Sequence, residues 1–159
     1  MRCPLAQAPA HLDRFFAERA DANGRLALTL RAPFEVPGLG SKVALERAAA
    51  ISIERGPAHG NARPLYVRWS SEAGGPFPTF AGTLAIEADE EYTSCRLALV
   101  GSYEPPLGIA GKVFDTVLGH RIALATARDL LGRLAEYIEQ CYADTEARKS
   151  VLRASPAAG

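Results

Sequence analysis

Three residues of this sequence have side chains suited to proton transfer or anion binding and lie on faces predicted to point inward: Arg47, Tyr103 and His120. His120 interrupts an otherwise apolar helical stripe, and histidine is the side chain whose charge changes near neutral pH. One interpretation is a ligand contact or an acid–base group. The other is a buried histidine bonded to a backbone carbonyl or a tyrosine hydroxyl, which the general pairing of buried polar groups favours.

Arg47 alternates with the apolar residues of a predicted strand that includes Ile51. A buried arginine requires an anionic partner, because an unpaired buried charge is strongly destabilising. That partner is either a ligand carboxylate or a protein carboxylate such as Glu87 or Asp115. A bulge at Ala48–Ala50, which would turn the arginine outward, is a third interpretation.

Two aromatic residues offer large flat surfaces to an apolar ligand. Trp69 and Tyr103 lie on inward faces of predicted strands, although ordinary core packing explains both equally well. Together with one apolar helix residue they complete the predicted ligand-binding set, which is His120, Tyr103, Trp69, Arg47 and Leu124.

No catalytic residue is assigned, because the motifs that would position one are missing. The sequence has no GxSxG around a serine, and Gly38–Lys42 is too short for a phosphate-binding loop and precedes a strand. The acidic trio Asp89–Glu91 is typical of a solvated turn. Because His11, His59 and His120 are scattered without ligand spacing, neither a metal nor a cofactor is expected.

The composition excludes several classes of partner. Eighteen basic and eighteen acidic residues give a net charge of zero, which argues against a nucleic-acid or anionic-membrane partner. No apolar run is long enough to span a bilayer, and the N-terminus lacks the pattern of a secretory signal. Three widely spaced cysteines indicate free thiols in a reducing compartment, hence a cytoplasmic protein. A homodimer is compatible with these features.

The hydrophobic period changes twice along the chain. Alternating patterns predict strands, and a period of 3.6 predicts helices. The expected order is a helix over 10–23, strands over 25–34, 42–56, 65–71, 79–89 and 94–103, and a long helix over 112–148. Five strands joined by short loops indicate an antiparallel sheet. The predicted fold class is therefore α+β, as one domain over residues 1–150 with a disordered tail over 151–159.

The long helix carries one apolar stripe, which should lie along the concave side of a curved sheet. Its positions are 113, 117, 120, 124, 127, 131, 134, 138 and 141. Before it, the corner "GSYEPPLGIAGKVFD" combines two prolines that fix the backbone with glycines that permit unusual angles, so it should aim the helix across the sheet. Small residues such as Ala49, Gly101 and Ala123 would either thin the interface into a cavity or allow close packing.

This order of elements resembles the helix-grip fold of the START-like (SRPBCC) superfamily, which includes pollen allergens, lipid-transfer domains and polyketide cyclases. The resemblance is carried by "FAGTLAIEADEEYTSCRLALVGSYEPPLGIAGKVFDTVLGHRIALATARDLLGRLAEYIE", Phe80 to Glu139. Members usually have seven strands, with two short helices after the first strand, whereas this sequence predicts five strands after an initial helix.

The resemblance implies a curved sheet wrapped around the C-terminal helix, with a hydrophobic or amphipathic small molecule held in the cavity between them. Two alternatives follow from the same architecture. One is a polyketide cyclase/dehydratase-like enzyme in which His120, Tyr103 or Arg47 moves protons. The other is a protein–protein assembly or co-chaperone module that uses the outer sheet face around Tyr66 and Phe77–Phe80.

Overall fold

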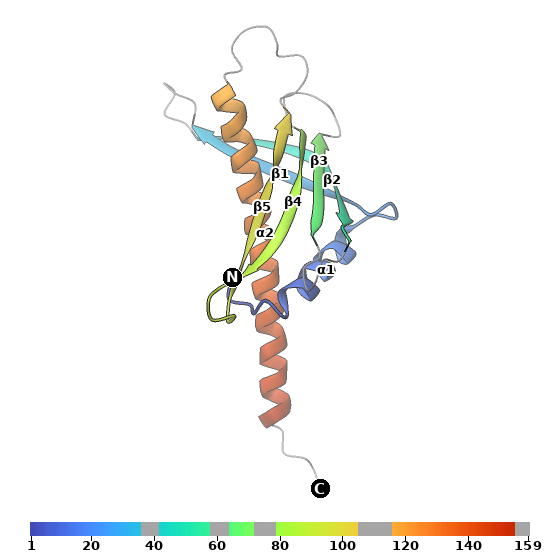
Figure 1. Ribbon diagram of the computed structural model, residues 1–159, viewed down its shortest axis with the longest axis vertical. Coiled ribbons are helices and arrows are strands. Elements are labelled where there is room, and N and C mark those ends of the chain that lie inside the picture. Colours follow the sequence, from blue (N-terminus) through green and yellow to red (C-terminus); the bar gives the residue numbers. More distant parts are fainter. Residues whose placement is uncertain (36–41, 58–63, 72–78, 105–115, 155–159) are drawn as a thin grey trace.

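The computed structural model describes residues 1–35, 42–57, 64–71, 79–104 and 116–154, and it confirms the α+β class. The elements in chain order are α1 (Ala8–Arg19), β1 (Arg25–Glu35), β2 (Lys42–Arg55), β3 (Leu65–Ser71), β4 (Thr79–Ala88), β5 (Cys95–Glu104) and α2 (Thr116–Ala154). The five strands form one antiparallel sheet, and α2 packs along it in a helix-grip arrangement (Figure 1). The predicted corner over 105–115 lies outside the described residues.

Every strand pairs with its neighbour in sequence, so the spatial order is β1-β2-β3-β4-β5. The registers are continuous, from Arg25↔Ser52 to Glu35↔Lys42 between β1 and β2, and from Thr79↔Glu104 to Ala88↔Cys95 between β4 and β5. No bulge is therefore present at Ala48–Ala50.

The sheet curves around α2, because the helix contacts both of its edge strands, β1 and β5. Strands β3, β4 and β5 run alongside the helix, whereas β1 crosses it obliquely (Figure 1). The strands twist in the usual sense, so the line of contact rotates around the helix as it is followed along its length.

Helix α1 is shorter than predicted and ends at Arg19. The expected stop at Asn23–Gly24 lies in the turn that follows. There the carboxylate of Asp21 accepts hydrogen bonds from the backbone N–H groups of Asn23 and Arg25, at 2.8 and 2.9 Å. An aspartate that bonds the backbone a few residues onward competes with helix continuation, so it ends the helix early and starts β1.

Helix α1 is fastened to α2 by aromatic and charged contacts. The rings of Phe15 and Tyr137 meet edge-on at 5.1 Å between centroids, and the guanidinium of Arg19 lies 4.2 Å from the centroid of Phe15. The hydroxyl of Tyr137 donates a 2.7 Å hydrogen bond to Glu18. The segment before α1 is tied to the sheet by a pair of backbone bonds, from Met1 to Cys95 and back, at 2.8 and 3.1 Å.

The buried thiol of Cys3 and the packed hydroxyl of Tyr137 lead us to expect a loss of stability at alkaline pH. Burial raises the pKa of the Cys3 thiol from 9.0 to about 11, and burial together with the bond to Glu18 raises the pKa of Tyr137 from 10.0 to about 12. Both shifts favour the neutral forms in the fold. Their contribution is therefore intact below pH 9 and is lost as the pH rises toward about 12.

Urea unfolding followed between pH 8 and pH 12 should show this loss. In Cys3→Ala, the decrease in unfolding free energy between pH 9 and about pH 11 should be smaller than in the unmodified protein. In Tyr137→Phe, the decrease between pH 10 and about pH 12 should be smaller. A pH dependence that is identical in both variants and in the unmodified protein would contradict the assignment.

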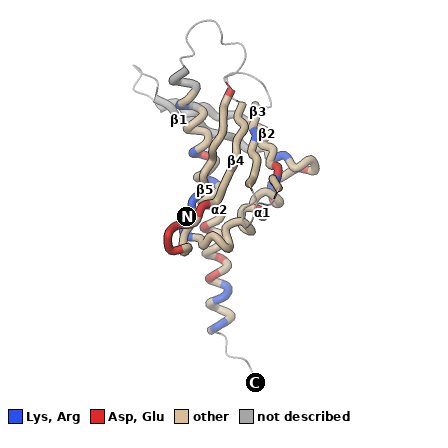
Figure 2. Tube along the Cα trace, viewed as in Figure 1, with Lys and Arg blue, Asp and Glu red and all other residues tan. Residues whose placement is uncertain are grey.

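Helix α2 extends beyond its predicted end at residue 148. The helix continues through Ala154, so residues 151–154 are helical rather than part of a disordered tail, and 155–159 lie outside the described residues. Its 39 residues span about 58 Å at 1.5 Å per residue. The last turns extend beyond the sheet, with acidic and basic residues interspersed along them (Figures 1 and 2). In the described part of the chain, no helix is long and apolar enough to cross a membrane.

Candidate functional site

The inner face of the sheet carries one row of residues that runs through all five strands. Its members face one another in register, in the order Leu26, Ile51, Trp69, Phe80 and Tyr103. The row is aliphatic on β1 and β2 and aromatic on β3, β4 and β5. Because side chains alternate between the faces of a strand, the residues before and after these point to the opposite face.

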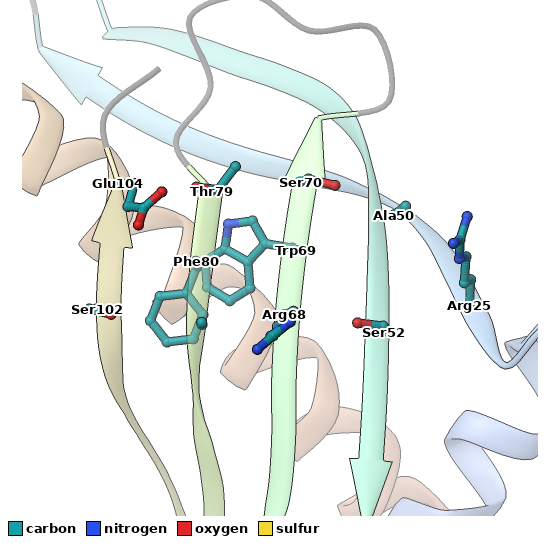
Figure 3. A pocket seen from close by; sticks show the side chains of 11 residues that line it. Arg25, Ala50, Ser52, Arg68, Trp69, Ser70, Thr79, Phe80, Ser102 and Glu104 are labelled. Carbon is teal, nitrogen blue, oxygen red and sulfur yellow. The ribbon is translucent and has the colours of Figure 1, made fainter. Parts of the chain in front are cut away.

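Trp69 is buried, with 2% of its surface exposed, as its place on the inward face predicted. Its indole stacks on Phe80, with ring centroids 4.1 Å apart and an angle of 14° between the planes. The stacked pair forms the centre of the aromatic half of the row (Figure 3).

Phe80 in turn lies over two glycines that face each other across β4 and β5, Gly82 and Gly101. A Cβ atom on Gly82 would come within 2.6 Å of the Phe80 ring, and one on Gly101 within 2.7 Å. Gly101 was predicted either to thin the interface into a cavity or to allow close packing of the helix on the sheet, but the atoms nearest the position of its missing Cβ belong to β4 and not to α2. Its missing side chain makes room for an aromatic ring of the same sheet.

His120 and Tyr103 are brought together at the end of the row. Their ring centroids lie 6.1 Å apart, and the planes are tilted by 48°. However, His120 is exposed, so its predicted inward position is wrong. It lies on the same side of α2 as the buried Ile138, 18 residues or five turns earlier, but there the helix presents it beside Tyr103 of the edge strand β5.

Leu124 is also placed differently from its prediction, since 40% of its surface is exposed. The buried residues Thr126, Leu130, Leu134 and Ile138 follow one another at intervals of four. Such a ridge is inclined to the helix axis, whereas the predicted stripe repeats every seven residues. A twisted sheet follows the inclined ridge, which leaves Leu124 on the solvent side of it.

Arg47 is placed only by its backbone. It pairs with Leu30 in the uninterrupted register of β1 and β2, two residues before the buried Ala49. The side chain of Arg47 lies outside the described part of the structure. The interpretation that required a bulge is wrong, and the choice between a ligand and a protein carboxylate stays a prediction.

Half of the interface between sheet and helix is filled. The space left among Leu26, Ile51, Val67, Leu130 and Leu134, with their neighbours, measures about 10 Å³, which is at most the space of one water molecule. In this half the protein's own side chains leave no room for a ligand.

Three buried polar atoms have no hydrogen-bond partner among the described residues: the indole Nε1 of Trp69, the hydroxyl of Thr126 and Oδ1 of Asp89, whose other oxygen is bonded in the turn after β4. Leaving such a group unpaired costs about 1–3 kcal/mol, so buried polar groups are normally satisfied. The indole of Trp69 and the hydroxyl of Thr126 belong to elements that line the interface between sheet and helix. They are the groups to which a ligand oxygen or hydroxyl would add a missing partner.

The described residues contain no group of histidine, cysteine and acidic side chains that could hold a metal ion. The protein–protein alternative relied on an outer-face surface around Tyr66 and Phe77–Phe80, of which the structure describes only a part. Tyr66 is 46% exposed, but Phe80 turns inward to Trp69, and Phe77 lies outside the described residues.

The outer face instead holds a feature that sequence reasoning missed, an open depression of about 520 Å³ (Figure 3). Its floor is made of small side chains, among them Ala50, Ser52, Ser70 and Ala81. Its members come from all five strands, so only the register brings them together. Alternation along each strand was the one signal available in the sequence, and it showed no more than that they share a face.

Comparison with protein-family models, with curated proteins and with solved structures finds no match to this chain. The class is therefore defined by the fold itself, an α+β domain in which an antiparallel sheet grips a long C-terminal helix.

Proposed function

We propose that this protein is a non-catalytic binding module that holds a hydrophobic or amphipathic small molecule between the sheet and α2, at the aromatic end of the inner row. Apolar pockets with a few polar groups are the usual form of small-molecule sites. The stacked rings of Trp69 and Phe80 supply the apolar surface. Tyr103 and His120 lie together at the outer margin of the same end.

The observation that carries the proposal is the indole N–H of Trp69, which has no acceptor within the described ranges and belongs to a side chain that is 2% exposed. A buried tryptophan normally donates this hydrogen to an acceptor. A ligand carbonyl, ether or hydroxyl oxygen would accept it while the rest of the ligand contacts the rings. The hydroxyl of Thr126 offers a second polar contact of the same kind.

The helix-grip arrangement supports membership of the START-like superfamily, in which ligands occupy the same place between sheet and helix. Free thiols support a cytoplasmic location, since Cys3, Cys95 and Cys141 form no disulfide. Both assignments belong to the proposal.

Trp69 is the only tryptophan of the chain, so its fluorescence reports the site directly. A neutral apolar dye such as Nile red should quench this emission saturably, and organic extraction of the purified protein should release an apolar compound detectable by mass spectrometry. Replacing Leu124 by alanine should leave dye binding unchanged, because that side chain lies on the solvent side of α2.

The variant Trp69→Phe keeps an apolar ring but removes the N–H donor. We expect affinity for the extracted compound, measured by calorimetry, to fall about tenfold, the effect of one lost hydrogen bond in a buried site. Absence of both an extractable compound and saturable quenching would overturn the proposal, and unchanged affinity in Trp69→Phe would remove the indole from it.

One observation favours the enzymatic alternative, the approach of His120 and Tyr103 to 6.1 Å between ring centroids. Two groups able to move protons thereby lie at the margin of the proposed site. A cyclase/dehydratase-like protein should turn over a poly-β-ketone substrate with a pH dependence that disappears in His120→Ala. Because His120 is exposed, this variant should retain its fold, and retained turnover would exclude the role.

A further inference from the structure

The outer depression lies across a second row of residues that runs through all five strands. In register, this row is Arg25, Ser52, Arg68, Ala81 and Ser102. Neighbouring strands lie about 4.8 Å apart, so the two arginines flank Ser52 with their backbones about 10 Å from each other. Figure 3 shows Arg25 and Arg68 on either side of Ser52.

Within the described residues, neither arginine of this row has an ion-pair partner. The contrast with the other edge of the sheet is informative, because there Arg96 faces Glu87 in register and binds it at 2.7 Å. Arg25 and Arg68 both face Ser52 instead. The side chains that neighbour Arg25 and Arg68 in this row are therefore small hydroxyl and methyl groups rather than carboxylates.

From this arrangement we infer a second binding site, in which Arg25 and Arg68 bind one oxyanion, a carboxylate or a phosphate, of a small polar molecule. The planar guanidinium donates two parallel hydrogen bonds to such a group, and these charge-assisted bonds are the strong ones. The hydroxyls of Ser52 and Ser70, which line the same depression, add neutral donors.

The opposite rim of the depression limits which molecules fit. Glu104 lines this rim on the edge strand β5, whereas Arg25 lies on the other edge strand, β1. A carboxylate there repels a second anionic group and accepts hydrogen bonds from an amine or a hydroxyl. The site thus selects a molecule with one anionic end and a donor at the other, and it disfavours polyanions.

The test uses the full chain and two probes, inorganic phosphate and acetate, each added at constant ionic strength. In ¹⁵N–¹H correlation spectra, the backbone amides of Ser52, Arg68 and Ser70 should shift saturably while those of α2 do not. Saturation by phosphate alone identifies a phosphate-bearing ligand, and saturation by acetate identifies a carboxylate-bearing one.

Arg25→Gln and Arg68→Gln should each weaken binding about tenfold, the effect of one lost charge-assisted contact. The matched control is Arg128→Gln, which removes an equally exposed charge from α2 and should have no effect. Ser52→Val should fill the floor of the outer depression without changing the net charge of the protein.

Linear shifts without saturation, or shifts that persist unchanged in Arg68→Gln, would overturn the inference. Trp69 and Phe80 also border the outer depression, so the two proposals are separated by the charge of the probe and not by the position of the tryptophan. Neither result would bear on the ligand proposed for the inner face, because Nile red is uncharged and does not need the arginines.

Discussion

Replacing Leu134 by alanine is expected to lower the free energy of unfolding by about 3 kcal/mol, within the range for fully buried leucines. Leu134 is 1% exposed and belongs to the filled half of the interface between sheet and helix. Nothing nearby can collapse into the vacated volume without moving a strand. Urea unfolding, with the midpoint and the slope determined separately, measures the loss.

The matched control is Leu124→Ala, which removes the same atoms from the same helix. Because Leu124 is 40% exposed, the expected change is below about 0.5 kcal/mol. Equal losses at both positions would contradict the inclined ridge and restore the seven-residue stripe predicted from the sequence.

A second large effect is expected at the pair of facing glycines. A Cβ atom added to Gly101 would come within 2.5 Å of the Cα atom of Gly82 and would also meet the carbonyl oxygen of Ala81. Those are backbone atoms, which move only if the two strands separate. Gly101→Ala should therefore destabilise the protein by about 2–3 kcal/mol, as overpacking of a core does.

Gly132→Ala provides the comparison for this variant. No atom lies within 4 Å of the position that its Cβ would take, and the residue is inside α2. Alanine is preferred to glycine in a helix by about 1 kcal/mol, so this variant should be more stable than the parent. Thermal unfolding should move in opposite directions for the two variants, and a neutral Gly101→Ala would contradict the close approach of β4 and β5.

The strands were predictable almost to the residue because alternation is a local signal. Leu65, Val67 and Trp69 are buried and the residues between them are exposed, as the pattern required. The sheet topology followed from the short connections, since only antiparallel neighbours can be joined so briefly.

The phase of α2 was not predictable, because it depends on the twist of the surface that the helix meets. In the sequence, Leu124 and His120 belong to an apolar stripe. In the structure, however, the helix buries the inclined ridge that includes Thr126 and Leu130. Thr126 lies outside the predicted stripe, and its burial was not predicted.

The outer site was missed for a different reason. Arg25 and Ser52 are 27 positions apart, Ser52 and Arg68 are 16 apart, and nothing near any one of them in the sequence marks it as part of a binding site. They become neighbours only through the registers of β1, β2 and β3. Sites built on cross-strand rows therefore need coordinates, whereas motifs confined to one loop do not.

The position of the gripping helix after all five strands has a consequence for biosynthesis. Each hairpin of the meander can close as soon as its second strand leaves the ribosome, because all strand pairs are sequential. The nascent sheet then exposes its row of leucine, isoleucine and aromatic side chains until residues 116–154 have been translated. A message truncated before that point would encode a product prone to aggregation, and a chaperone that shields the growing chain would be needed most in that interval.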